Sequence, residues 1–381
     1  MPSTPTDRPT TPPTLWAARG RHAGPDADDV LRHHVRRLKD DEVLDDFLEP
    51  PVAEGAPERI FEARWRVPGE VTVRARLTLV PVAGDGSEWT LVAEAEQPWD
   101  QSWPSPATLF WPDTPDAAWD QEAATGLPFR DLNLLPSDDK AIRRLFKDAV
   151  RGWAVHVVVH EAMTTDERGR RPLTRLLPPG LRHRVVEHRA APDQLRVVNW
   201  ALRGLGVEVP RGGAVVLPGH PVPPGYEDGD FCVRSVFLDG SEPTELIETV
   251  TRYAALPKPL PDGLEEALTA LREQWQLLTL EEELARERSL VAMYAEALEA
   301  MTRSRDLYRE AAERANEALA AYREAVPDPA PDSSPGAPAG SPLQQLTRTF
   351  ERFKGSTRAL RPARSEGDGE DPPGTSGHEV S

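Results

Sequence analysis

The amino-acid sequence predicts an α+β fold with three parts: an antiparallel strand-rich N-terminal unit, a mixed α/β middle unit and a long C-terminal helical coiled-coil arm, with disordered termini. Apolar and polar residues alternate along three consecutive runs between residues 61 and 95, the pattern of strands with one solvated face. Helical patterns and apolar strand patterns then alternate over residues 137–257. Residues 264–326 contain neither Gly nor Pro, in a chain with 40 Pro and 26 Gly, which indicates a long helix.

The N-terminal unit is expected over residues 27–136, behind a Pro/Thr-rich leader (residues 1–26) that we predict to be disordered. Helical spacing of apolar residues predicts one amphipathic helix over residues 28–47. The connection over residues 97–136 is rich in Trp and Pro. Its aromatic rings could form a platform for a ligand, but we favour packing, since long loops are often held by buried aromatic side chains.

The middle unit is expected over residues 137–257. The patterns predict helices over 138–153, 192–205 and 243–255, and strands over 154–160, 181–187, 214–217 and 231–238. The sequence contains no glycine-rich phosphate loop, because its GLG at 204–206 follows a helix instead of a strand.

The arm is expected over residues 258–326, where apolar residues recur at alternating spacings of three and four, as in a heptad repeat. The repeat changes phase near Thr279, and Glu282 follows three residues later, which is the spacing of a capping box. We therefore favour a short helix docked on the body, then a break and a longer helix. Leu298 and Leu319 are predicted core positions of the longer helix, against either the chain's own globular part or another chain, because periodicity reports burial and not the partner.

The tail over residues 327–381 is predicted to be disordered, with a basic amphipathic motif at 342–364. Four of its apolar residues share a helical face, and two of its arginines supply charge: Leu343, Leu346, Phe350, Phe353, Arg348 and Arg352. Such a motif predicts docking on a protein partner. Contact with a membrane surface is possible in principle but less favoured, because the apolar face is short.

Histidines at strand spacing form the best candidate for chemistry. His156 and His160 would share one face of a strand, and so would His183 and Glu187 on another. If these strands were neighbours, the four residues could bind zinc or manganese and activate a water molecule. Structural histidines remain the default, since neither HVVVHE nor HRVVEH follows a known zinc-binding motif.

The net charge of −18 argues against general nucleic-acid binding, which needs a basic surface. One cysteine excludes an internal disulfide, and no apolar stretch of membrane-spanning length or secretory signal occurs, so a cytoplasmic protein is expected. Only 5 of the 45 basic residues are Lys, which fits a bacterial genome of high GC content. We predict a non-enzymatic interaction or scaffold protein without cofactor that acts through the arm and the tail motif. The alternatives are a metal-dependent hydrolase and a peripheral membrane organiser.

Overall fold

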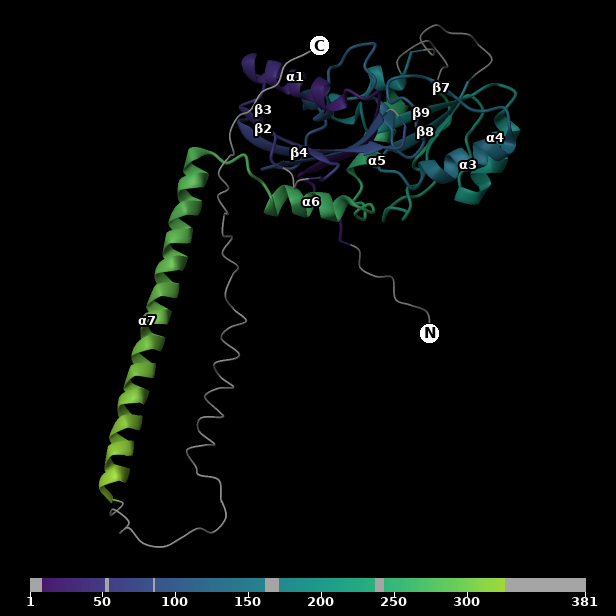
Figure 1. Cartoon of the computed structure of the whole chain (residues 1–381). Coiled ribbons are helices and arrows are strands. Elements are labelled where there is room, and N and C mark those ends of the chain that lie inside the picture. Colours follow the sequence, from purple (N-terminus) through teal and green to yellow (C-terminus); the bar gives the residue numbers. More distant parts are fainter. Residues whose placement is uncertain (1–8, 52–54, 85, 162–170, 237–242, 326–381) are drawn as a thin grey trace, which may run out of the picture. The chain divides into compact units, whose positions relative to one another are not determined.

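The computed structural model describes residues 9–51, 55–84, 86–161, 171–236 and 243–325. The chain divides into two units, residues 1–290 and 291–381. The first holds two sheets with their covering helices, and the boundary falls within the last helix (Figure 1). The predicted α+β class is confirmed: an antiparallel sheet, a mixed sheet and a long C-terminal helix follow one another along the chain.

The first sheet has six antiparallel strands in the order β2-β3-β4-β5-β1-β6. Its strands are β1 (Leu15–Ala23), β2 (Asp46–Leu48), β3 (Arg59–Val67), β4 (Val71–Val82), β5 (Gly86–Ala95) and β6 (Gln121–Glu122). The three strands predicted from alternation are β3, β4 and β5. They form a meander in which Val67 pairs with Val71 across the first turn.

The predicted disordered leader is wrong in its described part, because β1 is an inner strand between β5 and β6. Both faces of β1 are buried: Leu15 and Ala17 contact one cluster of apolar residues, while Trp16 and Ala18 contact the other. A strand buried on both sides shows no apolar–polar alternation. Gly20 makes room for an indole, since a Cβ at this position would lie 2.2 Å from Cζ2 of Trp89.

Helices and aromatic loops cover one face of the first sheet. Helix α1 (Ala27–Asp40) buries Leu31 and Val35 there, and ends before the predicted helix does, because residues 46–48 form the edge strand β2. The short α2 (Ala107–Phe110) lies in the Trp-rich connection. Trp111 and Trp119 are fully buried, so packing, and not an exposed platform, is confirmed for this connection.

The second sheet has the order β11-β10-β8-β9-β7 and contains both parallel and antiparallel pairs. Its strands are β7 (Asn133–Leu134), β8 (Val155–His160), β9 (Val185–Ala190), β10 (Ala214–Val216) and β11 (Cys232–Val233). Helices α3 (Asp139–Ala149) and α4 (Leu195–Leu202) pack on one face, and α5 (Thr244–Ala255) packs on the other. Short 3₁₀ turns occur at Leu173–Arg175, Pro179–Leu181 and Arg203–Leu205.

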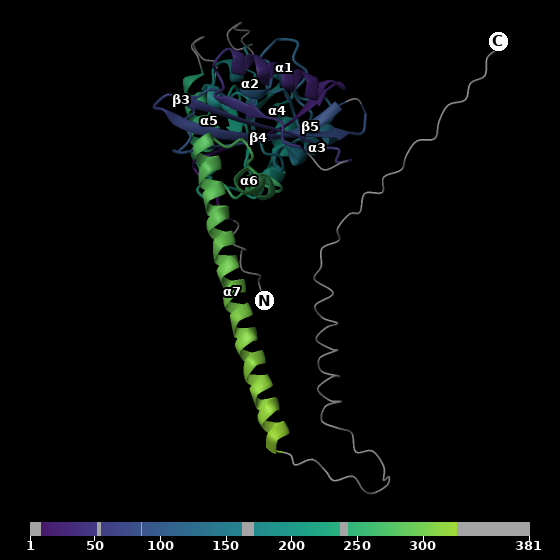
Figure 2. The same cartoon turned by 60° about the vertical axis from the view of Figure 1, so that its left-hand side comes forward.

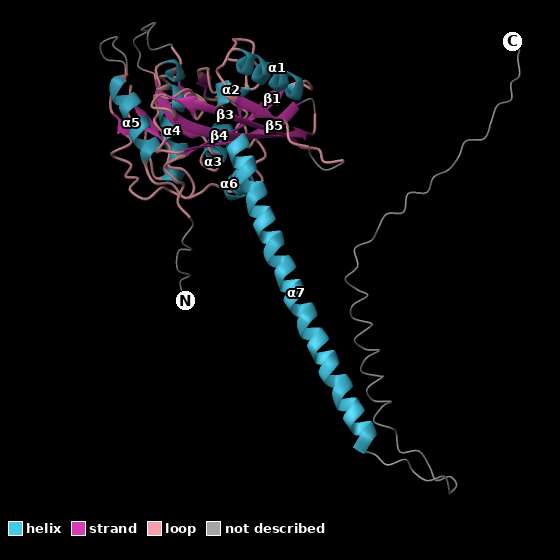
Figure 3. Cartoon of the chain, turned by 90° about the vertical axis from the view of Figure 1, so that its left-hand side faces the viewer, coloured by secondary structure: helices cyan, strands magenta, loops and turns pink. Residues whose placement is uncertain are grey.

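Helix α6 (Leu264–Glu273) covers the other face of the first sheet, opposite α1 (Figure 3). It buries Leu264, Leu268 and Leu271 there. The predicted docked helix is therefore confirmed. Helix α7 (Leu280–Ala325) follows as one continuous helix of 46 residues (Figure 2).

The predicted capping box begins α7. The backbone N–H of Glu282 donates to Oγ1 of Thr279 at 3.0 Å, and the backbone N–H of Thr279 donates to Oε2 of Glu282 at 2.8 Å. These two bonds satisfy donors that a helix start leaves unpaired, so the change of heptad phase marks a real end of one helix and start of the next.

A buried ion pair holds the segment between α6 and α7 on the sheet. Glu62 is fully buried and its Oε1 accepts from Nη1 of Arg76 at 2.8 Å. The other carboxylate oxygen of Glu62 accepts from the backbone N–H groups of Gln276 and Leu277 at 2.8 and 3.0 Å. Arg76 in turn donates to the carbonyl oxygen of Gln274 at 3.2 Å. The buried Glu62 carboxylate thus accepts hydrogen bonds from three groups, the Arg76 side chain and two backbone N–H groups.

We expect Glu62→Ala to lower the free energy of unfolding by about 3 kcal/mol or more, because it leaves the Arg76 charge buried and unpaired. Chemical denaturation measures this change. Glu88→Ala is the matched control: it breaks the exposed Arg21–Glu88 pair of the same sheet and should cost less than about 1 kcal/mol. Equal losses in the two variants would contradict the role given to Glu62.

Candidate functional site

The histidines predicted to bind metal lie on β8 and β9, which are parallel neighbours. The register pairs His156 with Val186 and Val157 with Glu187. Paired positions share a face and successive residues alternate, so His156 and His160 face the side of α3 and α4, whereas Glu187 faces the side of α5. His183 lies before β9 begins. The structure does not bring the four residues together.

Each of these side chains has its own partner. Nδ1 of His156 lies 2.9 Å from Nε2 of His188, with the two rings stacked. Nδ1 of His160 accepts from the backbone N–H of Gly212 at 2.9 Å. In the part of the chain that the structure describes, no group of three or more His, Cys, Asp or Glu residues could hold a metal ion. The predicted shared metal site is therefore corrected to separate structural roles.

Glu187 is buried on β9 of the second sheet, where it forms hydrogen bonds within the fold. Its Oε1 accepts from Nε of Arg189 at 2.6 Å, and its Oε2 accepts from the backbone N–H of Leu173 at 2.7 Å. Burial raises the pKa of Glu187, and the Arg189 charge opposes that shift. Both carboxylate oxygens are engaged within the fold, which is the arrangement of a structural residue.

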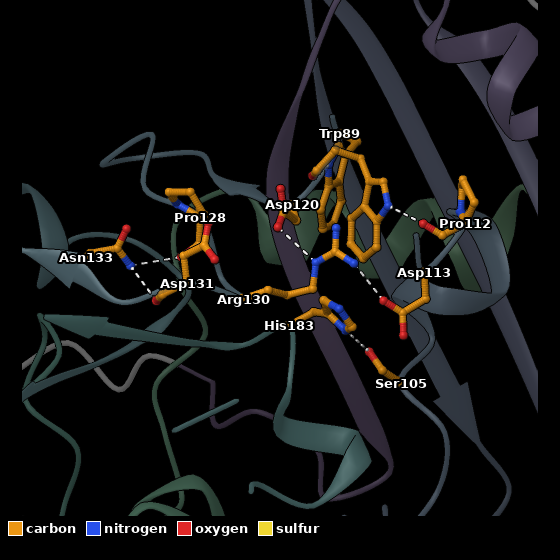
Figure 4. Close-up of polar contacts among 11 residues, drawn as sticks. Trp89, Ser105, Pro112, Asp113, Asp120, Pro128, Arg130, Asp131, Asn133 and His183 are labelled. Carbon is orange, nitrogen blue, oxygen red and sulfur yellow. Dashed lines mark hydrogen bonds and ion pairs between the residues drawn. The ribbon is translucent and has the colours of Figure 1, made fainter. Parts of the chain in front are cut away.

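A different site forms around His183, where Arg130 is the central residue (Figure 4). Nε of Arg130 donates to Asp120 at 2.9 Å, and its Nη1 donates to Asp113 at 2.7 Å. Its guanidinium group lies over the Trp119 ring, 5.5 Å from the ring centre. The Trp119 ring packs against the His183 imidazole with 4.8 Å between ring centres. The cation, the indole and the imidazole thus lie in close succession.

Hydrogen bonds from neighbouring segments fix these side chains. Nδ1 of His183 lies 3.0 Å from Oγ of Ser105, and Nε1 of Trp119 donates to the carbonyl oxygen of Pro112 at 2.8 Å. Nδ2 of Asn133 donates to the carbonyl oxygens of Pro128 and Glu187 at 2.9 and 3.1 Å. Asn133 therefore ties the loop that carries Arg130 to strand β9.

A cavity of about 370 Å³ opens at this site, and its lining is mainly polar: Asp113, Pro115, Asp120, Arg130, Asp131, Thr174, Arg175, Arg182 and His183. Among the described residues, Nε2 of His183 and Oγ1 of Thr174 are buried without a hydrogen-bond partner. Burial lowers the pKa of His183 to about 3, so its imidazole is neutral at pH 7 and a weak base. The site is thus suited to hydrogen-bonding a small polar molecule and poorly suited to abstracting a proton.

The second candidate surface is the apolar line along α7. Large apolar side chains on this helix remain exposed, with 66 % of Leu298 and 48 % of Leu319 accessible. The exposed residues that follow the heptad line are Leu280, Leu284, Val291, Tyr294, Leu298, Met301, Tyr308, Leu319 and Tyr322, and we call this line the seam. The other predicted partner-binding residues, in the motif at 342–364, lie outside the described residues.

No protein-family model and no curated protein sequence matches this chain. The described residues contain no helix that is long and apolar enough to cross a membrane. Sequence reasoning did not find the cavity around His183, because its residues come from two separate regions, 113–131 and 174–183, and follow no fixed spacing. The only usable signal was the density of Trp residues in the connection, and that signal equally fits packing.

The buried histidines predict loss of stability in acid. Burial lowers the pKa of His156 and of His183 to about 3. Below pH 6.5 the unfolded chain takes up protons at these residues, whereas the folded chain does not until about pH 3. The free energy of unfolding should therefore fall as the pH drops through this window, by about 2 kcal/mol for each residue at pH 5.

Denaturation midpoints between pH 7.5 and 4.5 measure this effect. Replacing His183 by Asn should make the decline shallower, since one proton-uptake site is removed from the unfolded state. His33→Asn, at an exposed position, is the control and should leave the slope unchanged. A profile with no decline below pH 6.5 would contradict the burial of neutral imidazoles.

Proposed function

We propose that this chain is a non-enzymatic interaction protein, and that α7 joins two copies of it through the seam. The observation that carries this proposal is the seam itself: nine large apolar side chains on one line of a helix, each at least 48 % exposed. Exposed apolar residues that gather in this way mark interaction surfaces. A heptad line is also the pattern that a partner helix buries.

The sizes of the seam residues favour an antiparallel pair. Bulky residues dominate the first half of α7, whereas Ala312 and Ala315 occupy the same line in the second half. In a parallel pair, Ala312 would face its own copy and leave a void, and Tyr294 would face its own copy and crowd the interface. In the antiparallel pair with full overlap, Tyr294 faces Ala312 and Val291 faces Ala315. In these two pairs a large residue meets a small one, whereas the remaining apolar pairs match residues of similar size.

Charge supports the same orientation. Arg305 occupies a core position of the seam and bonds Asp306 of its own helix, with distances of 3.0 and 3.2 Å. A parallel pair would place two Arg305 side chains against each other, which is unfavourable in a desolvated interface. In the antiparallel pair Arg305 faces Met301. At the ends of the overlap, Glu281 of one helix then comes beside Arg323 of the other.

The remaining parts of the proposal rest on sequence. The motif at 342–364 would bind a second protein partner through its apolar and basic residues. A cytoplasmic location fits the single cysteine. No observation on the described residues favours a metal-dependent hydrolase or a membrane organiser.

Cysteine crosslinking tests the orientation in full-length protein with Cys232→Ser as the background. The antiparallel pair has its two-fold axis near Arg303, so Ser304→Cys should form a disulfide between copies. Ala318→Cys should not, because it faces Leu290 of the other copy. Equal crosslinking at both positions, or at neither, would contradict the antiparallel pair.

A charge on the seam should separate the copies. In the Ser304→Cys background, Leu298→Asp should abolish the crosslink, since a carboxylate cannot be solvated in an apolar interface. Ala292→Asp is the matched control, because it adds the same charge to the same helix off the seam. If both variants retain the crosslink, the seam is not the interface.

The tail motif makes a separate prediction, measured by co-purification from the native host. Phe350→Ser with Phe353→Ser should abolish partner binding at any salt concentration, because it removes the apolar anchors. Arg348→Glu with Arg352→Glu should weaken binding most at low ionic strength, where charges act over the longest range. Co-purification that survives deletion of residues 342–364 would show that the motif is not a docking site, and binding of the motif to anionic vesicles instead would assign it to membranes.

A further inference from the structure

A second cavity, of about 450 Å³, lies in the first unit beside β1, whose Leu15 and Ala17 form part of its wall. Its walls come from the segment at residues 10–17, from Trp99 and Trp153, and from the chain between the end of α5 and the start of α6. Most of the lining is apolar, with several Pro residues and the two indoles. A volume between about 300 and 1,000 Å³ with a few polar groups is typical of a small-molecule site.

Two cations, Arg184 and Lys258, line this cavity. The Arg184 guanidinium lies 5.9 Å from the centre of the Trp16 ring, and Nζ of Lys258 lies 4.2 Å from the centre of the Tyr253 ring. Aromatic faces attract cations but do not neutralise them. Within the described chain neither residue forms an ion pair, and Nε of Arg184 is buried without a hydrogen-bond partner. The cavity therefore carries positive charge, and none of the described residues that line it has a carboxylate to balance that charge.

The titration of these groups reflects that environment. Burial and, as a smaller effect, the neighbouring Arg184 charge together lower the pKa of Lys258 to about 7. Burial also lowers the pKa of Arg184 to about 10. Holding two like charges together away from water is unfavourable unless an opposite charge joins them. A bound anion would supply that charge.

Other polar atoms at the cavity also lack partners. Nε1 of Trp99 and Oε1 of Gln101 are buried without a hydrogen bond among the described residues. Nε1 of Trp153 donates to the carbonyl oxygen of Asp262 at 3.2 Å, which fixes that indole as a wall. The site thus combines two cations, an unsatisfied N–H donor and an unsatisfied amide oxygen with flat apolar walls. An inorganic anion would not contact those walls.

We propose that this cavity binds a small organic carboxylate with an apolar body, its charged end between Lys258 and Arg184 and its body against Trp99 and Trp153. The carboxylate would accept hydrogen bonds from both cations, and the indoles would cover the apolar part. This binding site is independent of the seam and of the pairing of two copies.

Calorimetry on the full-length protein tests the proposal with 4-phenylbutyrate as the probe and its neutral amide, 4-phenylbutyramide, as the matched control. We expect saturable binding of the carboxylate and binding at least about 10-fold weaker for the amide, since only the carboxylate pairs with the cations. Binding near pH 7.5 should also take up protons, because the anion stabilises the charged form of Lys258. Titrations in two buffers of different ionisation enthalpy measure that uptake.

Variants assign the binding to this cavity. Lys258→Gln should weaken binding about 10-fold and abolish proton uptake, and Lys258→Arg should retain binding without proton uptake. Arg184→Gln should weaken binding by a similar factor. Lys140→Gln, at an exposed position on α3, should change nothing. Failure of the carboxylate to saturate, equal affinity for the amide, or unchanged affinity in both Lys258→Gln and Arg184→Gln would overturn the proposal.

Discussion

The buried ion pair between Glu62 and Arg76 determines where the docked helix ends and the exposed helix begins. The six-stranded sheet has apolar side chains on both faces. Each face must therefore pack against other parts of the chain, because apolar side chains are unstable in contact with water. Aromatic loops and α1 cover the first face, and α6 covers the second. Glu62 accepts hydrogen bonds from the backbone N–H groups of Gln276 and Leu277, which lie between α6 and α7. The capping box of Thr279 then begins α7, the helix that carries the exposed seam.

Sequence patterns predicted the elements with a clear apolar pattern, including β8, which is buried on both faces. Alternation located β3, β4 and β5, and the spacing of Thr279 and Glu282 located the start of α7. The strand β1 was missed for a physical reason: Trp16 and Ala17 are both buried, so the run LWAARGRHA lacks the alternation that identifies a strand with a wet face. Its neighbour in sequence, a Pro/Thr-rich stretch, also favoured a disordered interpretation.

The candidate sites depended on information that spacing does not carry. The two-residue period correctly places His156 and His160 on one face of β8, but whether Glu187 joins them depends on the register between two strands, which is set by distant contacts. The cavities around His183 and Lys258 combine segments that are far apart in sequence, so no local pattern could have revealed them. For α7 the heptad repeat predicted an apolar line and left its partner open, because a seam of this kind has the same period whatever covers it.

Two features of the described residues carry the proposals: the exposed apolar seam of α7 and the two cations that line the second cavity. The seam is the larger of the two, and pairing of copies is the central claim that follows from it. Sedimentation equilibrium of the unmodified full-length protein tests this claim most directly. A mass that approaches twice the chain mass of 42.1 kDa as concentration rises is the predicted result, and a mass that stays at one chain at every concentration would contradict it.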